Sequence, residues 1–349
     1  MSATKMTYRF LGNSGLLVSK LSLGAWMSID KTDPRFTAEN WYKMMTTAFQ
    51  HGINFFDNAE NYMDGYSEEL AGLAIKRGIE EGVWSREDLV VTTKVFAGTK
   101  GFMGAGPNDQ GVHRKHVVEG VKASLRRLQL DNVDVVFCHR SEPYTPIEET
   151  VRAMNFVIQK GWAYYWGTSE WLASDIHEAC EIADRLGLIR PIVEQSQYNI
   201  FERNRVEFEY TDLYKKYKLG LTTWSPLAFG VLSGKYSAGT PSDSRLAMPA
   251  FKDASFDERV AMANKMKLIA NDLGCSLPQL ALAWCVSNEN VSTVMIGASR
   301  PEQLEENLKA LDFVEKVTPD VKAKIDAIVN FVPSVPKQDA LSTLRGRHL

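Results

Sequence analysis

The strongest constraint on the fold is a regular alternation, along the chain, of short strand-like runs with longer amphipathic runs. The short runs are rich in β-branched and aromatic residues and are apolar almost throughout, which is typical of parallel strands that are buried on both faces. Eight such runs occur, at Leu21–Trp26, Asn54–Ala59, Leu89–Val95, Val133–Arg140, Ala163–Glu170, Ile192–Tyr198, Leu221–Leu227 and Ser292–Ser299.

The longer runs between them have helical periodicity. They predict helices at Ala38–His51, Ser67–Gly78, Arg114–Leu130, Ile147–Lys160, Ser174–Leu186, Val206–Tyr217, Glu258–Leu273, Leu277–Ser287 and Pro301–Leu311. Thr145 before Pro146 is a predicted N-cap, and Ser299 repeats the arrangement before Pro301. Eight strands that are each followed by a helix favour an α/β fold of the closed (β/α)₈ TIM-barrel type over an open doubly wound sheet.

The length of the chain fits one such barrel with additions. A (β/α)₈ barrel occupies about 250 residues or more as one unit, so the 349 residues predict a single domain over 1–349. A short β-hairpin at Tyr8–Ser19 precedes the barrel, and the core is expected over about 8–331. Long loops at the barrel mouth are expected at Ala97–Val112 and Phe229–Asp257, and an irregular C-terminal tail is expected over 332–349.

Several common site motifs are absent from the sequence. An open dinucleotide-binding sheet places GxGxxG directly after its first strand, whereas Trp26-Met-Ser-Ile-Asp30 stands there. No P-loop, HExxH or EF-hand string occurs, and Gly167–Trp171 lacks the second glycine of a nucleophile elbow. The four cysteines have no CxxC spacing. Reduced thiols and no metal site are therefore expected.

Charge and hydropathy exclude other classes of partner. The formal net charge is −3, which provides no general basic surface for nucleic acid. No apolar run approaches the length of a membrane span, and the N-terminus lacks the pattern of a secretory signal. The sequence therefore predicts a cytoplasmic protein without membrane insertion and without a nucleic-acid partner.

Four polar residues follow or end predicted strands, where the active site of a TIM barrel lies. Asp57 ends the second strand, Tyr62 follows it by five residues, Lys94 ends the third and His139 ends the fourth. A lysine in an apolar strand requires a partner, and Asp57 is the obvious candidate. Taken alone, this pair is also consistent with a structural ion pair that ties the barrel together.

The tyrosine beside this pair points toward carbonyl reduction. That reaction needs an acid for the developing alkoxide, and a phenol with a pKa of about 10 is a weak one. An ammonium about 4 Å away stabilises the phenolate by about 4 kcal/mol at an effective dielectric constant of about 20. Lys94 is therefore expected to lower the pKa of Tyr62 by up to about 3 units, less the opposing effect of burial. His139 is expected to donate a hydrogen bond to the same carbonyl oxygen.

These residues carry a family resemblance. The string Phe55–Tyr62, with Lys94 after the third strand and His139 after the fourth, resembles the catalytic tetrad of aldo-keto reductases. The resemblance covers roughly residues 8–331. Four segments closely resemble one branch of this family, which contains the β subunits of voltage-gated potassium channels and their plant and microbial relatives. They are Val135–Pro143, Thr145–Met154, Tyr165–Trp171 and Thr223–Ala228.

The resemblance implies a role for each matching residue. Tyr62 would be the general acid for an aldehyde or ketone substrate, Lys94 and Asp57 would tune it, and His139 would orient the carbonyl. The implied cofactor is NADP(H). The residues implied to hold it are Trp26 and Asp57 near the nicotinamide, Ser169 and Gln195 on its carboxamide, Trp224, Ser225, Pro226 and Leu227 after the seventh strand, Lys235 and Arg245 at the phosphates, and Gly297, Ser299, Arg300, Gln303, Glu306 and Asn307 around the adenosine.

The segment Gly297-Ala-Ser-Arg-Pro301 supports the last group independently of the resemblance. It combines backbone N–H groups, a hydroxyl and a guanidinium at a predicted helix N-terminus, a set of donors that suits a 2′-phosphate. NADP(H) is therefore expected in preference to NAD(H).

Two functions remain open at this point. The first is a carbonyl reductase. The second is a cofactor-binding β subunit that docks on the cytoplasmic domain of a potassium channel, and by analogy with that branch a homotetramer is implied. Animal channel subunits commonly carry asparagine at the position of His139 and react slowly, so the histidine favours chemistry. About seven residues precede the hairpin, so no pore-plugging segment is expected. The chain departs from the family pattern at Glu170 and at Phe229, which is expected to narrow the substrate opening.

Overall fold

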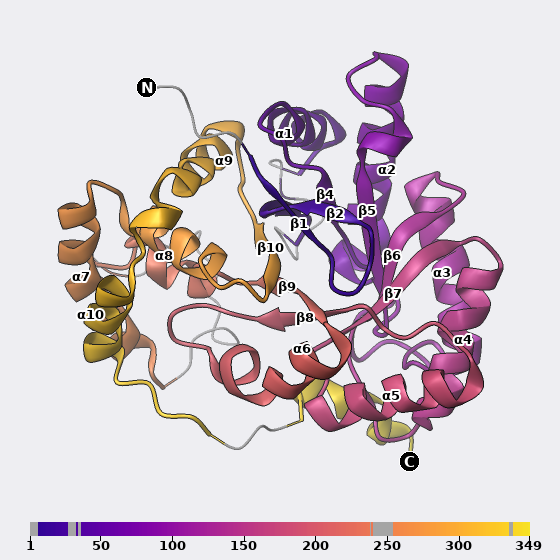
Figure 1. The fold of residues 1–349 in the computed structure, drawn as a ribbon. Coiled ribbons are helices and arrows are strands. Elements are labelled where there is room, and N and C mark those ends of the chain that lie inside the picture. The colour runs from indigo at the N-terminus through magenta and orange to yellow at the C-terminus, as the bar shows by residue number, and fades with distance from the viewer. Residues whose placement is uncertain (1–5, 27–32, 34–35, 238, 240–253, 335–337) are drawn as a thin grey trace.

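Eight parallel strands close into a barrel, and the computed structural model describes residues 6–26, 33, 36–237, 239, 254–334 and 338–349. Around the barrel the strands follow the order β10-β3-β4-β5-β6-β7-β8-β9 (Figure 1). They are β3 (Leu21–Gly24), β4 (Phe55–Asp57), β5 (Val90–Val95), β6 (Val133–Cys138), β7 (Ala163–Ser169), β8 (Val193–Gln197), β9 (Gly220–Trp224) and β10 (Val291–Ile296). The (β/α)₈ barrel predicted from the alternation is confirmed.

Helices surround this barrel on the outside (Figure 1). They are α1 (Ala38–Gln50), α2 (Tyr66–Glu80), α3 (Arg114–Leu128), α4 (Ile147–Gln159), α5 (Ala173–Leu186), α6 (Thr211–Tyr217), α7 (Phe256–Leu273), α8 (Leu277–Val286), α9 (Pro301–Leu308) and α10 (Pro319–Val329). Most lie within a few residues of the ranges that the periodicity predicts. The run predicted as one helix over Val206–Tyr217 is divided into a π-helical turn, Arg205–Glu209, and α6.

The predicted N-terminal hairpin is also present, and it closes one end of the barrel. Strands β1 (Tyr8–Phe10) and β2 (Leu17–Ser19) pair antiparallel. Leu11 and Val18 are fully buried among apolar side chains of the barrel interior such as Phe137. Gly12 has a φ of 56°, and a Cβ there would lie 2.0 Å from the carbonyl oxygen of Ile192. Glycine is therefore needed where the hairpin meets the barrel floor.

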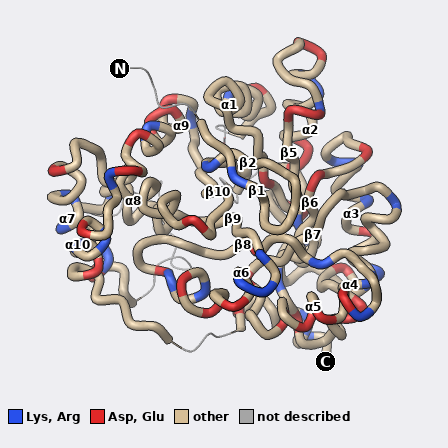
Figure 2. The backbone as a smooth tube through the Cα atoms, in the orientation of Figure 1, with Lys and Arg blue, Asp and Glu red and all other residues tan. Residues whose placement is uncertain are grey.

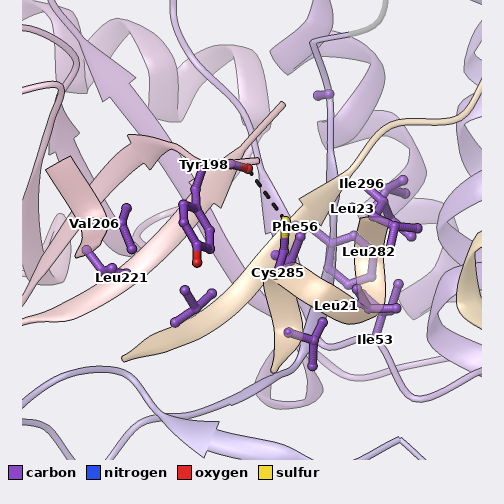
Figure 3. Packing of buried hydrophobic residues seen from close by; sticks show 14 of the residues in the cluster. Leu21, Leu23, Ile53, Phe56, Tyr198, Val206, Leu221, Leu282, Cys285 and Ile296 are labelled. Carbon is purple, nitrogen blue, oxygen red and sulfur yellow. Dashed lines mark hydrogen bonds between the residues drawn. The ribbon is translucent and has the colours of Figure 1, made fainter. Parts of the chain in front are cut away.

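A second apolar layer fills the space between strands and helices. Strand residues alternate between the barrel interior and this layer, as the period of two requires. Leu23 and Phe56 point outward and pack near Leu282 and Cys285 of α8 (Figure 3). The Cys285 thiol donates to the carbonyl oxygen of Tyr198 at 3.7 Å, and burial raises its pKa. The four cysteines are free thiols, as predicted.

Two predicted N-caps are wrong. Helix α4 has Pro146 at its N-cap position, and the Thr145 hydroxyl donates instead to the Glu142 carboxylate at 2.5 Å. Helix α9 begins after Arg300, and Ser299 lies one residue further out. In both places the hydroxyl donates to a side-chain oxygen, of Glu142 or of Gln303, and does not accept from a backbone N–H of the helix.

The C-terminal tail differs from the irregular end that was predicted. Residues Ala340–His348 form consecutive 3₁₀ turns, and Asp339 caps them because its carboxylate accepts from the Leu341 N–H at 2.8 Å. Arg345 forms an ion pair with Glu142 at 2.8 Å. Arg347 donates to the Ala105 carbonyl oxygen at 3.0 Å and to the Gln110 side chain. The segment therefore packs on the loops that follow β5 and β6.

Charged residues of both signs are interspersed over the outer helices (Figure 2). Within the described ranges no helix is long and apolar enough to cross a bilayer. The same ranges contain no cluster of three or more histidine, cysteine or acidic side chains that is arranged to hold a metal ion.

Candidate active site

The four predicted catalytic residues lie together at the mouth of the barrel. The Lys94 ammonium is 2.5 Å from the Asp57 carboxylate and donates to the Tyr62 hydroxyl at 2.9 Å. It also donates to the Asn58 carbonyl oxygen at 2.7 Å. The rings of Tyr62 and His139 meet edge to face, with centroids 5.8 Å apart. A phenol, an ammonium, a carboxylate and an imidazole from three successive βα units therefore form one cluster.

Neighbouring strands fix the positions of the two charged residues. Asp57 is the last residue of β4, and its register partner on β5 is Thr92, two residues before Lys94. Thr92 and Lys94 share a strand face, and the Thr92 hydroxyl donates to Asp57 at 2.6 Å. Lys94 is fully buried, and Asp57 is nearly so. An ion pair that is shielded from water in this way holds its geometry strongly, because either charge alone would be costly to bury.

The pKa of Tyr62 corrects one expectation. Burial raises it, Lys94 lowers it and Asp57 raises it again, so that the net pKa lies above the usual 10.0 of tyrosine. The sequence analysis expected Lys94 to lower this pKa, less the opposing effect of burial, and here burial outweighs Lys94. A sequence pattern identifies the charged partner but does not reveal how completely the phenol is removed from water. The phenol is protonated at neutral pH, as a proton donor must be.

Of the four clustered residues, Lys94 is protonated and charged, whereas His139 is neutral. Burial lowers the pKa of Lys94, but Asp57 and Tyr62 raise it further, so the net pKa lies above its usual value and the amine is an ammonium. Burial, with Arg140 and Lys94, lowers the pKa of His139 well below 6.5. The imidazole is therefore neutral at physiological pH and has one N–H to donate.

A buried pair behind the tetrad was missed by the sequence analysis. One oxygen of Glu60, two residues before Tyr62, accepts from the backbone N–H groups of Phe96 and Gly98 and lies 2.9 Å from Nε2 of His116. Glu60 thereby ties the loop that carries Tyr62 to the loop after β5 and to α3. The only signal in the sequence was a carboxylate between two catalytic residues, and nothing in it pointed to His116, which lies 56 residues away.

Two of the predicted nicotinamide residues flank the tetrad. The Gln195 amide lies 3.3 Å from the Asp57 carboxylate, and the Ser169 hydroxyl donates to the Gln195 carbonyl oxygen at 3.0 Å. Ser169 ends β7 and Gln195 lies within β8, and both side chains are buried. Glu170, the departure from the family pattern, accepts from the indole N–H of Trp224 at 3.0 Å and from the Gln197 N–H at 2.6 Å. Glu170 therefore fixes the orientation of Trp224.

Aromatic rings line the mouth beside these residues. Phe229 packs edge-on against Trp26, with centroids 6.3 Å apart, and against Trp224, with centroids 6.0 Å apart. Its φ of 54° is left-handed, in a segment that turns sharply after β9. Ser225 lies in the same turn, and its hydroxyl accepts from the Phe229 N–H at 3.1 Å. Pro226 and Leu227 complete the turn, so the predicted residues of this stretch are adjacent in space.

The predicted adenosine residues gather at the start of α9. Gly297, Ser299 and Arg300 are exposed, and the hydroxyl and the backbone N–H of Ser299 both approach the Gln303 side chain. The Glu306 carboxylate turns to Gln279 and Lys309. Asn307 is buried, and its amide nitrogen has no hydrogen-bond partner.

Two predicted phosphate ligands come from the long loop after β9. Lys235 is exposed, with its ammonium over the Tyr236 ring at 5.1 Å. Arg245 lies outside the described residues. The structure therefore brings the four predicted catalytic residues together with Ser169 and Gln195, whereas Lys235 follows β9 and the α9 residues follow β10.

Comparisons with known proteins agree with this geometry. The sequence pattern of the aldo/keto reductase family matches residues 20–330. A "Probable voltage-gated potassium channel subunit beta" from Arabidopsis thaliana is 50% identical over 337 residues, which cover 95% of this chain and 99% of that protein. A protein of the same description from Oryza sativa subsp. japonica is 50% identical over 333 residues, 94% of this chain and 98% of that protein. The chain belongs to the aldo/keto reductase family and is related to potassium channel β subunits.

Proposed function

We propose that this protein is an NADPH-dependent reductase of aldehydes and ketones, with Tyr62 as the general acid. The observation that carries the proposal is the buried contact of the Tyr62 hydroxyl with the Lys94 ammonium, which is itself paired with Asp57. An ion pair that only stabilised the fold would not need a phenol in contact with it. A site that donates a proton to a substrate needs such an acidic group.

The protein's own residues supply a proton and fix its direction. When bound, NADPH supplies the hydride that adds to the carbonyl carbon. The Tyr62 O–H gives its proton to the carbonyl oxygen as negative charge develops there, and the alcohol leaves as product. Lys94 stabilises the resulting phenolate by direct contact at 2.9 Å. The raised pKa of Tyr62 does not oppose the transfer, because an alkoxide is a stronger base than a phenolate.

His139 and Tyr62 together define where the carbonyl oxygen sits. The neutral imidazole offers one N–H beside the phenol, so the oxygen can accept from both. Two fixed donors that converge on one oxygen stabilise negative charge in the transition state more than in the ground state. The aromatic faces of Trp26, Trp224 and Phe229 form an apolar wall next to this point.

The residues at the start of α9 fit the adenosine end of NADPH. The Asn307 amide nitrogen is buried without a partner, and a ligand acceptor would satisfy it. The exposed Arg300 guanidinium and Ser299 hydroxyl stand at the helix N-terminus, where a phosphate is favoured. Ser169 and Gln195 would hold the nicotinamide end beside the tetrad, and Lys235 and Arg245 would hold the phosphates between.

The decisive variant is Tyr62→Phe. We expect it to lower kcat for an aldehyde such as para-nitrobenzaldehyde by about 100-fold or more, because the proton donor is lost while the ring remains. NADPH binding, followed by quenching of tryptophan fluorescence, should be unchanged. Turnover close to that of the unsubstituted protein would exclude Tyr62 as the acid.

A second candidate function is docking on a voltage-gated potassium channel. The supporting observation is the 50% identity, over 95% of the chain, to a protein described as a probable channel β subunit. The two functions are compatible, because docking would use the outer surface of the barrel and leave its mouth free. Co-purification of this protein, as a tetramer, with a potassium channel cytoplasmic domain would support the second function, and absence of the complex in several buffers would count against it.

A further inference from the structure

One charged contact joins the C-terminal segment to Arg140, the residue that follows His139. Nε of Arg140 lies 3.1 Å from the Asp339 carboxylate, and both side chains are largely buried, with 11% and 22% exposed. Arg140 directly follows His139. The chain ends on the side of the ring where α4 and α5 lie (Figure 1). Asp339, which is far from Arg140 in the sequence, therefore contributes a negative charge beside it.

The Arg140 guanidinium contacts His139 and Ser169, two residues of the candidate site. Its NH1 donates to the His139 carbonyl oxygen at 2.5 Å and lies 3.4 Å from the Ser169 hydroxyl. Its charge acts on both donors of the site, because it lowers the pKa of Tyr62 and that of His139. A guanidinium in this place would attract a carboxylate on a substrate unless another anion neutralised it.

Asp339 is built to be that anion. Its carboxylate accepts a hydrogen bond from the Leu341 N–H at 2.8 Å, and this bond restricts rotation of the side chain toward solvent. The rest of the segment is anchored separately, through Arg345 on Glu142 and Arg347 on Ala105 and Gln110. The contact with Arg140 is thus held from the Asp339 side by a cap and from the Arg140 side by the His139 carbonyl.

We infer that Asp339 is a specificity-determining residue: by neutralising Arg140 it makes the site select uncharged carbonyl compounds over those that carry a carboxylate. The inference rests on the proposed reductase function and goes beyond it, because it names the class of substrate. In the Asp339→Asn variant the Arg140 guanidinium is free to pair with a substrate carboxylate. The side chain keeps its size and a polar oxygen for the Leu341 cap.

The test compares para-carboxybenzaldehyde with its uncharged methyl ester. In Asp339→Asn we expect the ratio of kcat/KM for the acid to kcat/KM for the ester to rise roughly tenfold, the size of one charge-assisted hydrogen bond. The change should appear in KM for the acid, with kcat nearly constant. Asp339→Glu keeps the negative charge and should keep the original ratio. Arg347→Gln loosens the same segment away from Arg140 and should leave the ratio unchanged.

A binding measurement separates this inference from the proposed function. Benzoate and benzamide differ in charge but not in shape, and their binding with NADP⁺ present can be followed by tryptophan fluorescence without any turnover. Asp339→Asn should gain affinity for benzoate relative to benzamide by a similar factor. Equal effects on charged and uncharged ligands would overturn the role of Asp339, even if the unsubstituted protein reduces aldehydes. Absence of all reduction, with benzoate preference still gained, would instead contradict only the reductase proposal.

Discussion

The two halves of the barrel mouth are built in different ways. At the ends of β4, β5 and β6 the polar side chains are buried and bonded to one another, as Lys94 is to Asp57 and Tyr62. After β9 and β10 the corresponding side chains are exposed or turned to local partners, as Lys235 and Ser299 are. Folding itself therefore assembles the half that carries the proposed catalytic residues, the catalytic half, whereas the half proposed to bind the cofactor, the cofactor half, presents donors outward. Substitutions in the first half should affect stability and chemistry together, and those in the second should affect cofactor binding alone.

The largest effect is expected for Lys94→Met. The substitution leaves the Asp57 carboxylate buried without its ammonium, and breaking a buried pair in this way costs about 3–5 kcal/mol of stability. Activity should be lost as well, because nothing then stabilises the Tyr62 phenolate. The measurement is urea unfolding together with NADPH oxidation. The double variant Lys94→Met with Asp57→Asn should regain part of the stability and none of the activity. Equal stability of the single and double variants would show that the pair does not hold the catalytic half together.

The cofactor half should respond in the opposite way to Arg300→Gln. Arg300 is exposed, so the free energy of unfolding should change by less than about 0.5 kcal/mol. The Kd for NADPH should rise roughly tenfold or more, the loss of a charge-assisted bond to the 2′-phosphate, while the Kd for NADH stays constant. Fluorescence titration with each cofactor measures both. Lys324→Gln, an exposed cation on α10, is the matched control. Equal losses for the two cofactors would remove Arg300 from the 2′-phosphate.

The sequence predicted the barrel and the gathering of four polar side chains at its mouth for the same physical reason. Buried parallel strands must be apolar, so a polar residue such as Lys94 in one of them stands out, and the end of the strand fixes where it lies. The hydrogen-bond partners were harder to predict. The Asp339 contact with Arg140 and the His116 contact with Glu60 join segments that are far apart in sequence, and no periodicity relates them.

Quantities that depend on burial were the least predictable. Lys94 lowers the pKa of Tyr62, as the sequence predicted, but the sequence did not reveal the larger effect of desolvation, so the net pKa lies above its usual value. The 3₁₀ turns at Ala340–His348 were not predicted, because such short turns have no strong apolar repeat that a sequence pattern could reveal. The residues after β9 that include Arg245 lie outside the described structure, so their predicted role remains a prediction.

The smallest effect is expected for His116→Gln, which tests whether the support behind Tyr62 depends on charge. Burial lowers the pKa of His116, but the Glu60 carboxylate raises it, and the net pKa lies above the usual 6.5. The folded protein therefore holds this proton more tightly than the unfolded chain does. Its contribution to stability is fully present below about pH 6.5 and is lost as pH rises through the folded pKa.

Glu60 sets the lower limit of the pH range in which its ion pair with His116 stabilises the folded protein. Burial raises its pKa, but His116 and the backbone N–H groups lower it below 4.5, so its contribution is lost as pH falls through the folded pKa. We expect the unsubstituted protein to exceed His116→Gln in stability by about 1 kcal/mol near pH 6, with the gap closing at alkaline pH. Urea unfolding of both proteins across this range measures the gap. A gap that is constant with pH would mean that His116 supports the Tyr62 loop as a neutral hydrogen-bond donor and not as the charged partner of Glu60.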